Sequence, residues 1–308
     1  MIDFDKYWAE LRDEHRSGRR DGRLDWELIP RNQIVERHGL RWRVDWLRFS
    51  SVNDSLIHGW VASPVDHEPN RVGFLWLPGY SYGTPRPDET NLLKGVVTLC
   101  INVHGNKPDD PYVNPAGKSD YIVRGIDHPQ TYIYRTIVLH CLHAMDIVAE
   151  LDGIDSWRTV VGGMSQGGAL SLLVAANHDS PAVCFADMPF LCSIRSAIAV
   201  SHSPAYKTLT ALMKREPDRA HAVLDTVCLF DPLLHAQRIR IPTSLCAGGK
   251  DPNSPVATIQ PVYAAIASTI KQLRVYPDAG HVFLPQMVQT YTEWIERLVL
   301  DRTDPGYV

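Results

Sequence analysis

The feature that most constrains this chain is the repeated alternation of apolar, strand-like segments with helical segments after residue 130. Four short apolar runs lie at residues 157–163, 182–187, 241–249 and 272–277, and segments with helical periodicity separate them. Strands that alternate with helices in this way are typical of a parallel sheet with helices on both faces. We therefore expect an α/β fold built on a mostly parallel central sheet.

The N-terminal half is expected to begin this sheet and to add antiparallel strands. A first helix is predicted near residues 3–15. The alternating segments RWRVDWLRFSS (41–51) and LIHGWVAS (56–63) predict an antiparallel hairpin. The runs at 71–79 and 95–103 do not alternate, as expected of strands that are covered on both faces.

Composition places the chain among ordinary globular proteins. Its 308 residues include 44% hydrophobic and 21% charged residues, enough apolar material for a sizeable core. No Gly/Ser linker or low-complexity tract divides the sequence. We therefore expect one domain over residues 1–308, with an N-terminal helix and a helical cap region at about 190–238.

Charge and cysteine usage argue against several classes of partner. The formal net charge of −4 lacks the basic excess of a nucleic-acid binder, and no apolar run approaches the ~20 residues of a membrane span. The N-terminus lacks the pattern of a secretory signal. The six cysteines are scattered, without CxxC or zinc spacing. These features predict a cytoplasmic protein with reduced thiols and no bound metal.

The strongest motif is a G-x-S-x-G sequence at Gly163–Gly167 (GMSQG), between the run at 157–163 and the helical segment GALSLLVAAN. A serine on such a strand-to-helix turn is a candidate nucleophile, because the turn exposes its hydroxyl at the edge of the sheet. The alternative is a glycine-rich turn with an incidental serine. The strand and helix on either side favour Ser165 as the nucleophile.

A serine nucleophile needs an imidazole base and a carboxylate that orients the base, and in this fold they follow the serine in the order acid, then histidine. The histidines after Ser165 are His178, His202, His221, His235 and His281. Only His281 lies in a loop after a late predicted strand, with Gly280 before it. We therefore expect His281 to be the base.

Three aspartates compete for the role of the acid. Asp251 follows the run at 241–249, at the expected edge of the sheet. Asp187 ends the run at 182–187, and Asp278 stands three residues before His281. Asp251 is favoured over both, and Asp187 is the better rival.

An oxyanion hole needs backbone N–H donors. One is expected at Gln166, after the nucleophile, and the other at Tyr80, in the loop after the run at 71–79. A Pro-Gly turn that only reverses the chain is the alternative explanation for the second loop. His104 and Asn106 also follow a buried run, and we regard them as candidates for the pocket lining or for loop structure.

Together these motifs resemble the acetyl xylan esterase and cephalosporin C deacetylase group, carbohydrate esterase family seven. The resemblance extends over most of the chain. It is carried by the segments GGMSQGG (162–168), ADMPFLC (186–192), YIVRGIDHPQTYIYR (121–135), FDP (230–232) and DPNSP (251–255).

The resemblance implies an α/β-hydrolase fold with the triad and oxyanion donors named above. It further implies that Asp187 belongs to structural packing near the site, and that the protein forms compact homo-oligomers, often hexamers. Two departures concern the surroundings of the triad. The family's Arg-Gly-Gln motif is His-Gly-Asn at 104–106, and the Glu that follows the family's catalytic histidine is Val282.

The sequence thus predicts a serine carboxylic-ester hydrolase that removes short acyl groups, chiefly acetyl, from sugar-like alcohols. Such a triad needs no cofactor, and the expected partner is a small ester substrate. An acyltransferase or a peptidase could use the same triad, since a triad fixes chemistry better than it fixes the acceptor. A non-catalytic binding protein with this fold is the alternative from another class.

Overall fold

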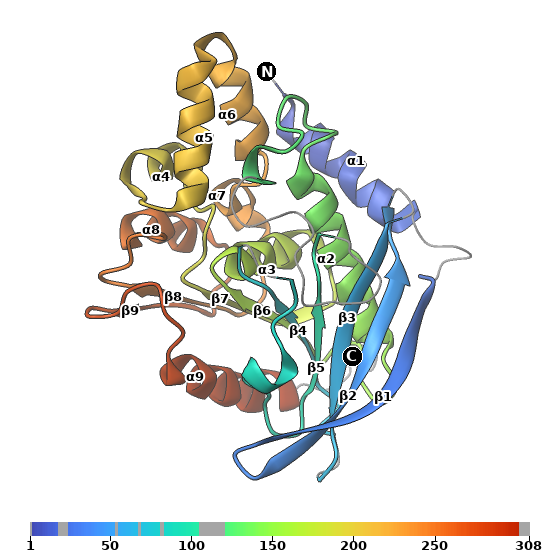
Figure 1. Cartoon of the computed structure of the whole chain (residues 1–308). Coiled ribbons are helices and arrows are strands. Elements are labelled where there is room, and N and C mark those ends of the chain that lie inside the picture. The colour runs from blue at the N-terminus through green and yellow to red at the C-terminus, as the bar shows by residue number, and fades with distance from the viewer. Residues whose placement is uncertain are drawn as a thin grey trace.

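A computed structural model describes residues 2–17, 24–52, 55–66, 69–80, 83–104 and 121–301. Its strands form one sheet in the order β1-β2-β3-β5-β4-β6-β7-β8-β9 (Figure 1). The parallel part comprises β4 (Gly73–Leu77), β5 (Val97–Ile101), β6 (Thr159–Met164), β7 (Pro181–Asp187), β8 (Thr243–Gly248) and β9 (Lys271–Tyr276). The predicted mostly parallel sheet is confirmed.

The predicted hairpin is also confirmed. β2 (Leu40–Ser50) and β3 (Leu56–Pro64) pair antiparallel, with Trp46 opposite Trp60. β3 then pairs antiparallel with β5 and joins the hairpin to the parallel strands.

The sequence prediction missed the edge strand β1 (Trp26–Arg37), which pairs antiparallel with β2. Only Val35 of this strand is buried, and the register shifts between Ile29 and Gln33. A strand held on one side by backbone bonds need not alternate apolar and polar side chains. Its sequence therefore carries little strand signal.

Helices cover both faces of the sheet (Figure 1). One face packs against α1 (Phe4–Ser17), α2 (Ile133–Glu150), α3 (Gln166–Asn177) and α8 (Val256–Ala265), and the other against α9 (Pro285–Ile295). A π-helical segment, Glu296–Leu300, continues α9.

The two faces of β4 show how the core is divided. Leu75 belongs to the large apolar cluster that contains α2 and α3, whereas Phe74 belongs to the cluster that contains α9. Phe74 is 2% exposed and Leu75 is fully buried. Burial of successive side chains explains why this run does not alternate.

The segment between β7 and β8 is helical, as expected for residues 190–238. It contains α4 (Ile194–Val200), α5 (Pro204–Arg215), α6 (Ala220–Cys228) and α7 (Pro232–His235). The Asp231 carboxylate accepts bonds from the N–H groups of Ser193, Ile194 and Leu233, at 2.9, 2.6 and 2.9 Å. One side chain thus connects the beginning of this segment to its end. Its action as a cap, and the single-domain organisation, stay predictions.

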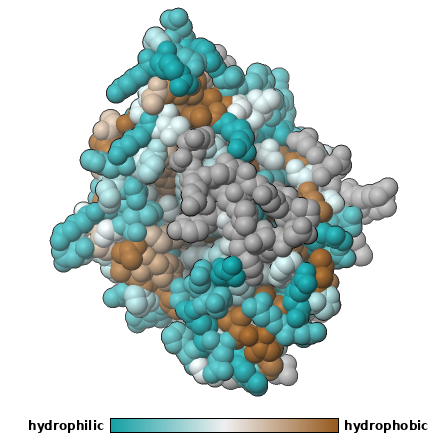
Figure 2. All heavy atoms as spheres, in the orientation of Figure 1, coloured by the Kyte–Doolittle hydropathy of each residue, from teal (hydrophilic) through white to brown (hydrophobic). Residues whose placement is uncertain are grey.

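The surface combines hydrophilic areas with smaller apolar ones (Figure 2). On the face in Figure 2, hydrophilic side chains surround several separate apolar patches, which is ordinary for a globular protein. All six cysteines are buried and free of disulfide bonds. Among the described residues, no helix combines the length and apolar composition that crossing a membrane requires.

Candidate active site

Ser165 forms the turn between β6 and α3, so the predicted strand–turn–helix context is confirmed. Its φ and ψ are 60° and −119°, a strained combination for a residue with a side chain. The surrounding backbone holds this conformation. The Ser165 N–H donates to the Asp187 carbonyl at 2.8 Å, and the Ser165 carbonyl accepts from the Phe190 N–H at 2.9 Å.

The two glycines of the motif permit a close approach between α3 and the end of β4. A Cβ atom on Gly167 would collide with the carbonyl oxygen of Leu77, and one on Gly163 would lie 2.6 Å from the same oxygen. Any larger residue would push the helix away from the strand. The motif is therefore required by packing as well as by the turn.

The structure brings His281 and Asp251 together. His281 Nδ1 lies 2.6 Å from Asp251 Oδ2. The Asp251 side chain is completely buried, whereas that of His281 is 19% exposed. A carboxylate bonded to Nδ1 fixes the imidazole tautomer and leaves Nε2 to accept a proton.

The loops that carry these two residues are also bonded to each other. The Gly249 N–H donates to the Tyr276 carbonyl at 2.8 Å, and the Lys250 N–H donates to the Ala279 carbonyl at 2.9 Å. The acid and the base therefore form one unit at the ends of β8 and β9.

The second oxygen of Asp251 is held by its own loop. Oδ1 accepts from the N–H groups of Asn253 and Ser254, at 2.8 and 3.0 Å. Sequence reasoning named these two residues only as part of the DPNSP segment and gave them no role of their own. The signal was available, because Asp followed by polar residues two and three positions later is typical of an Asx turn.

The rival Asp187 is occupied elsewhere. Its carboxylate accepts hydrogen bonds from the Tyr291 hydroxyl and from Cys246 Sγ. Burial raises the pKa of Asp187 to about 6, although both hydrogen bonds act to lower it. The side chain packs against β8 and α9 through these two contacts, and the resemblance likewise implies a structural role for it.

The other rival, Asp278, points to solvent. Its side chain is 91% exposed and pairs with Lys250 Nζ at 2.7 Å. A carboxylate in this position is hydrated and does not orient His281. Of the three aspartates, only Asp251 bonds to His281 in the structure.

Ser165 and His281 line one pocket of about 770 Å³. No hydrogen bond joins their side chains in the described part of the chain, but such bonds are often long before substrate binds. Sequence reasoning missed most of the other lining side chains. They include the aromatic residues Trp76, Phe190 and Phe283 and the polar residues Glu89, Asn91, Ser203 and Asn253. Val282, one of the two departures from the family pattern, also lines the pocket.

Tyr80 lies in the lining of this pocket, and Gln166 begins α3 beside Ser165. The N–H groups in the first turn of a helix have no partner within the helix, and the helix dipole favours negative charge there. The Gln166 side chain is buried and accepts hydrogen bonds at Oε1 from Tyr121 and Tyr134, at 2.7 and 2.8 Å.

Within the described residues, His104 is not part of the pocket lining. Its ring packs edge-on against that of Tyr121, with the ring centroids 4.5 Å apart. Burial lowers the pKa of His104 to about 3, so the imidazole is neutral near pH ~7. This contact agrees better with loop structure than with substrate binding. Asn106 lies outside the described residues.

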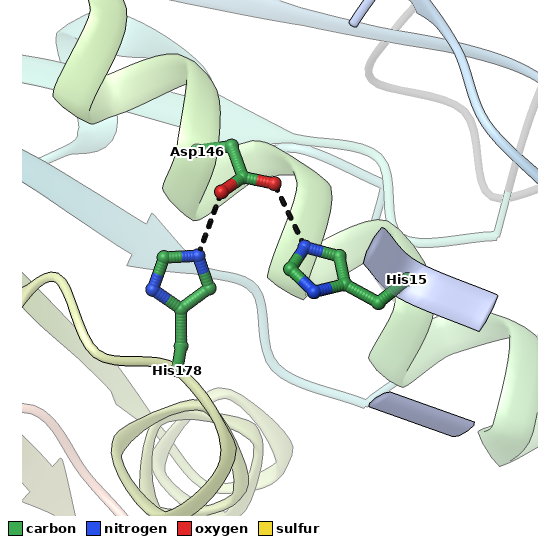
Figure 3. A group of neighbouring side chains, drawn as sticks. All are labelled: His15, Asp146 and His178. Atoms are coloured by element: carbon green, nitrogen blue, oxygen red, sulfur yellow. Dashed lines mark hydrogen bonds and ion pairs between the residues drawn. The ribbon is translucent and has the colours of Figure 1, made fainter. Parts of the chain in front are cut away.

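A second group of titratable residues lies away from the pocket. His15 on α1 and His178 after α3 point toward separate oxygens of Asp146 on α2 (Figure 3), at 2.7 and 3.0 Å. Burial alone would raise the pKa of Asp146, but the two hydrogen bonds hold it below its ordinary value.

This group has the residue types of a metal site, yet its hydrogen bonding does not fit one. A histidine that binds a metal normally donates its other N–H to an acceptor. Nδ1 of His178 instead accepts the Ser180 N–H at 3.1 Å, which puts the proton on Nε2, the atom that faces Asp146. We interpret the group as a hydrogen-bonded connection among α1, α2 and α3.

The sequence model of the family described as "Acetyl xylan esterase (AXE1)" matches residues 2–298. Among curated proteins, the acetyl esterase Axe7A from Xylanibacter ruminicola is 24% identical over 214 residues. The match covers 67% of this chain and 47% of that protein, so the chain spans about half the length of this curated relative.

Two solved structures resemble nearly the whole chain. The acetyl xylan esterase from Paenibacillus sp. R4 is 26% identical with a TM-score of 0.81, covering 97% of this chain and 95% of the other. Acetyl xylan esterase 1 from Thermoanaerobacterium sp. JW/SL YS485 is 24% identical with a TM-score of 0.81, covering 97% and 94%. The predicted α/β-hydrolase fold is confirmed.

Gly167→Ala should lower the free energy of unfolding by at least about 2 kcal/mol, because the added methyl meets backbone that cannot move freely. Gly280→Ala is the matched control, since its Cβ would meet only the Lys250 carbonyl oxygen at 4.0 Å. The control should change stability by less than about 0.5 kcal/mol. Urea unfolding measures both values, and equal effects would contradict the packing argument.

The burial of Asp187 should make stability fall as pH rises between about 4 and 6. The unfolded carboxyl ionises near pH ~3.9 and the folded one near 6, so ionisation favours the unfolded chain in this interval. The wild type should lose about 2 to 3 kcal/mol across it relative to Asp187→Asn, which cannot ionise. Urea unfolding of both proteins at a series of pH values gives this difference, and parallel curves would contradict it.

Proposed function

We propose, from the premise that the chain belongs to the acetyl xylan esterase family, that it is a serine carboxylic-ester hydrolase. Its substrates would be short acyl esters, chiefly acetyl esters, of sugar-like alcohols. The observation that carries the proposal is the hydrogen bond between Asp251 and His281 at a pocket that also contains Ser165.

In this mechanism Ser165 Oγ attacks the acyl carbon while His281 Nε2 takes the hydroxyl proton. Asp251 stabilises the resulting imidazolium through Nδ1–H. The alcohol then leaves with the proton from His281, and the acyl group remains on Ser165. Water repeats the sequence, releases the acid and restores the serine.

The oxyanion formed in both steps would accept hydrogen bonds from the N–H groups of Tyr80 and Gln166. The position of Gln166 at the first turn of α3 supports this assignment, because that end of the helix favours negative charge. The position of Tyr80 in the lining of the same pocket as Ser165 supports the second donor. These steps use only groups of the chain, the substrate and water, so the proposed reaction needs no cofactor.

The pocket supports a substrate with an apolar face and several hydroxyl groups. Its aromatic lining offers flat apolar surface, and Glu89, Asn91 and Asn253 offer hydrogen-bonding groups. Pockets of this mixed kind orient a ligand through a few polar contacts. The cytoplasmic location and the homo-oligomer, often a hexamer in the family, stay predictions.

Ser165→Ala should lower kcat for hydrolysis of p-nitrophenyl acetate by at least about 10³-fold, because alanine has no hydroxyl with which to form the acyl-enzyme. The wild type should prefer acetate over butyrate and octanoate. Circular dichroism checks that the variant is folded. Equal release of nitrophenol by both proteins would contradict the nucleophile, whereas transfer to an added alcohol or cleavage of a peptide would favour the rival activities. Absence of turnover, together with failure of Ser165 to react with a fluorophosphonate, would favour the binding protein.

Asp251→Asn should lower kcat by about 10⁴-fold, because an amide favours the wrong imidazole tautomer. Asp278→Asn is the control, since this exposed carboxylate pairs only with Lys250 among the described residues. Its kcat should stay within about twofold of the wild type, as expected for a surface change away from the chemistry. A larger loss in Asp278→Asn than in Asp251→Asn would reverse the assignment of the acid.

A further inference from the structure

Tyr121 lies between the two residues proposed as oxyanion donors. It is 1% exposed and begins a short 3₁₀ helix, Tyr121–Val123. Its ring stacks on the Tyr80 ring, with centroids 4.2 Å apart and planes 18° apart. Its hydroxyl donates to Gln166 Oε1 at 2.7 Å. One side chain therefore contacts both residues.

The same short helix contacts Tyr80 a second time. The Ile122 N–H donates to the Tyr80 hydroxyl at 3.2 Å. Tyr80 is thus held at its ring and at its hydroxyl, which limits the rotation of the side chain and of the loop that carries it.

Gln166 is held just as closely. A carbonyl oxygen has two lone pairs, and the hydroxyls of Tyr121 and Tyr134 both donate to Oε1. All three side chains are buried. Burial raises the pKa of Tyr134 well above its ordinary value, so its hydroxyl remains a donor. Breaking either bond would leave a polar group unsatisfied in the interior.

The two N–H groups of the proposed oxyanion hole come from different elements, the loop after β4 and the first turn of α3. Such donors are effective only when they are already placed for the developing charge, and shifts of a fraction of an ångström matter. We propose that Tyr121 is a positioning residue that holds the backbone N–H groups of Tyr80 and Gln166 in a fixed arrangement relative to each other. This inference rests on the proposed function, and it assigns Tyr121 no contact with substrate.

The chain offers a matched control. Tyr132 is a fully buried tyrosine of the same aromatic cluster, and its ring centroid lies 5.5 Å from that of Tyr134. Its hydroxyl has no hydrogen-bond partner among the described residues. Tyr132→Phe removes a buried hydroxyl without removing a bond. Tyr121→Phe keeps the ring on Tyr80 but loses the bond to Gln166, and Tyr121→Leu loses both contacts.

Kinetics with p-nitrophenyl acetate, normalised by fluorophosphonate titration of Ser165, test the proposal. Loss of one donor costs about 10² to 10³ in kcat, so a displaced donor in Tyr121→Phe should cost about tenfold, and Tyr121→Leu more. KM should stay within about twofold, and affinity for a short alkyl boronic acid should fall by the same factor as kcat. Tyr132→Phe should match the wild type. Equal kcat and boronate affinity in Tyr121→Phe and Tyr132→Phe would overturn the proposal while leaving the esterase function intact.

Amide hydrogen exchange separates this inference from the function on which it rests. The Tyr80 and Gln166 amides should exchange faster in Tyr121→Leu than in Tyr132→Phe. Tyr134→Phe should affect Gln166 alone, because Tyr134 bonds Gln166 and makes no ring contact with Tyr80 in the described part of the chain. A wild type without esterase activity would refute the proposed function. Unchanged exchange in Tyr121→Leu would refute the positioning role, whatever the activity.

Discussion

The close approach of α3 to the end of β4 is the constraint on which the rest of the site depends. Gly163 and Gly167 leave no room for a Cβ beside the Leu77 carbonyl. This contact puts the first turn of α3 next to the loop after β4, and Ser165 takes up the strain of the connection between β6 and α3. A single packing requirement thus determines where the serine, the helix terminus and the Tyr80 loop lie.

The acid and the base come from the other half of the sheet, and they arrive as a unit. Parallel pairing of β8 with β9 sets their register, and the backbone bonds Gly249–Tyr276 and Lys250–Ala279 continue that pairing into the loops. The position of His281 relative to Ser165 then depends on the pairing of β6, β7 and β8. A shift in strand register in either half of the sheet would therefore move the acid and the base away from the serine.

Features carried by one segment, or by the order of segments along the sheet, could be predicted from the sequence, whereas most side-chain contacts between distant segments could not. The parallel strands were visible as apolar runs, and the serine turn as a glycine pattern between a strand and a helix. β1 was missed because an exposed edge strand depends on its neighbour's backbone. The bonds from Tyr121 and Tyr134 to Gln166 span 45 and 32 residues, and nothing in any one of these segments indicates that they meet.

The three aspartates show why residue type alone could not decide the acid. Asp187 is buried against Tyr291 and Cys246, where desolvation favours its protonated form. Asp278 is hydrated and pairs with Lys250. Asp251 is equally removed from water, but two backbone N–H groups and the His281 ring replace the hydration it loses. These bonds hold the carboxylate against Nδ1 of His281, where it can orient the ring and stabilise an imidazolium. Sheet order suggested the same residue, but the hydrogen bonds supply the physical reason.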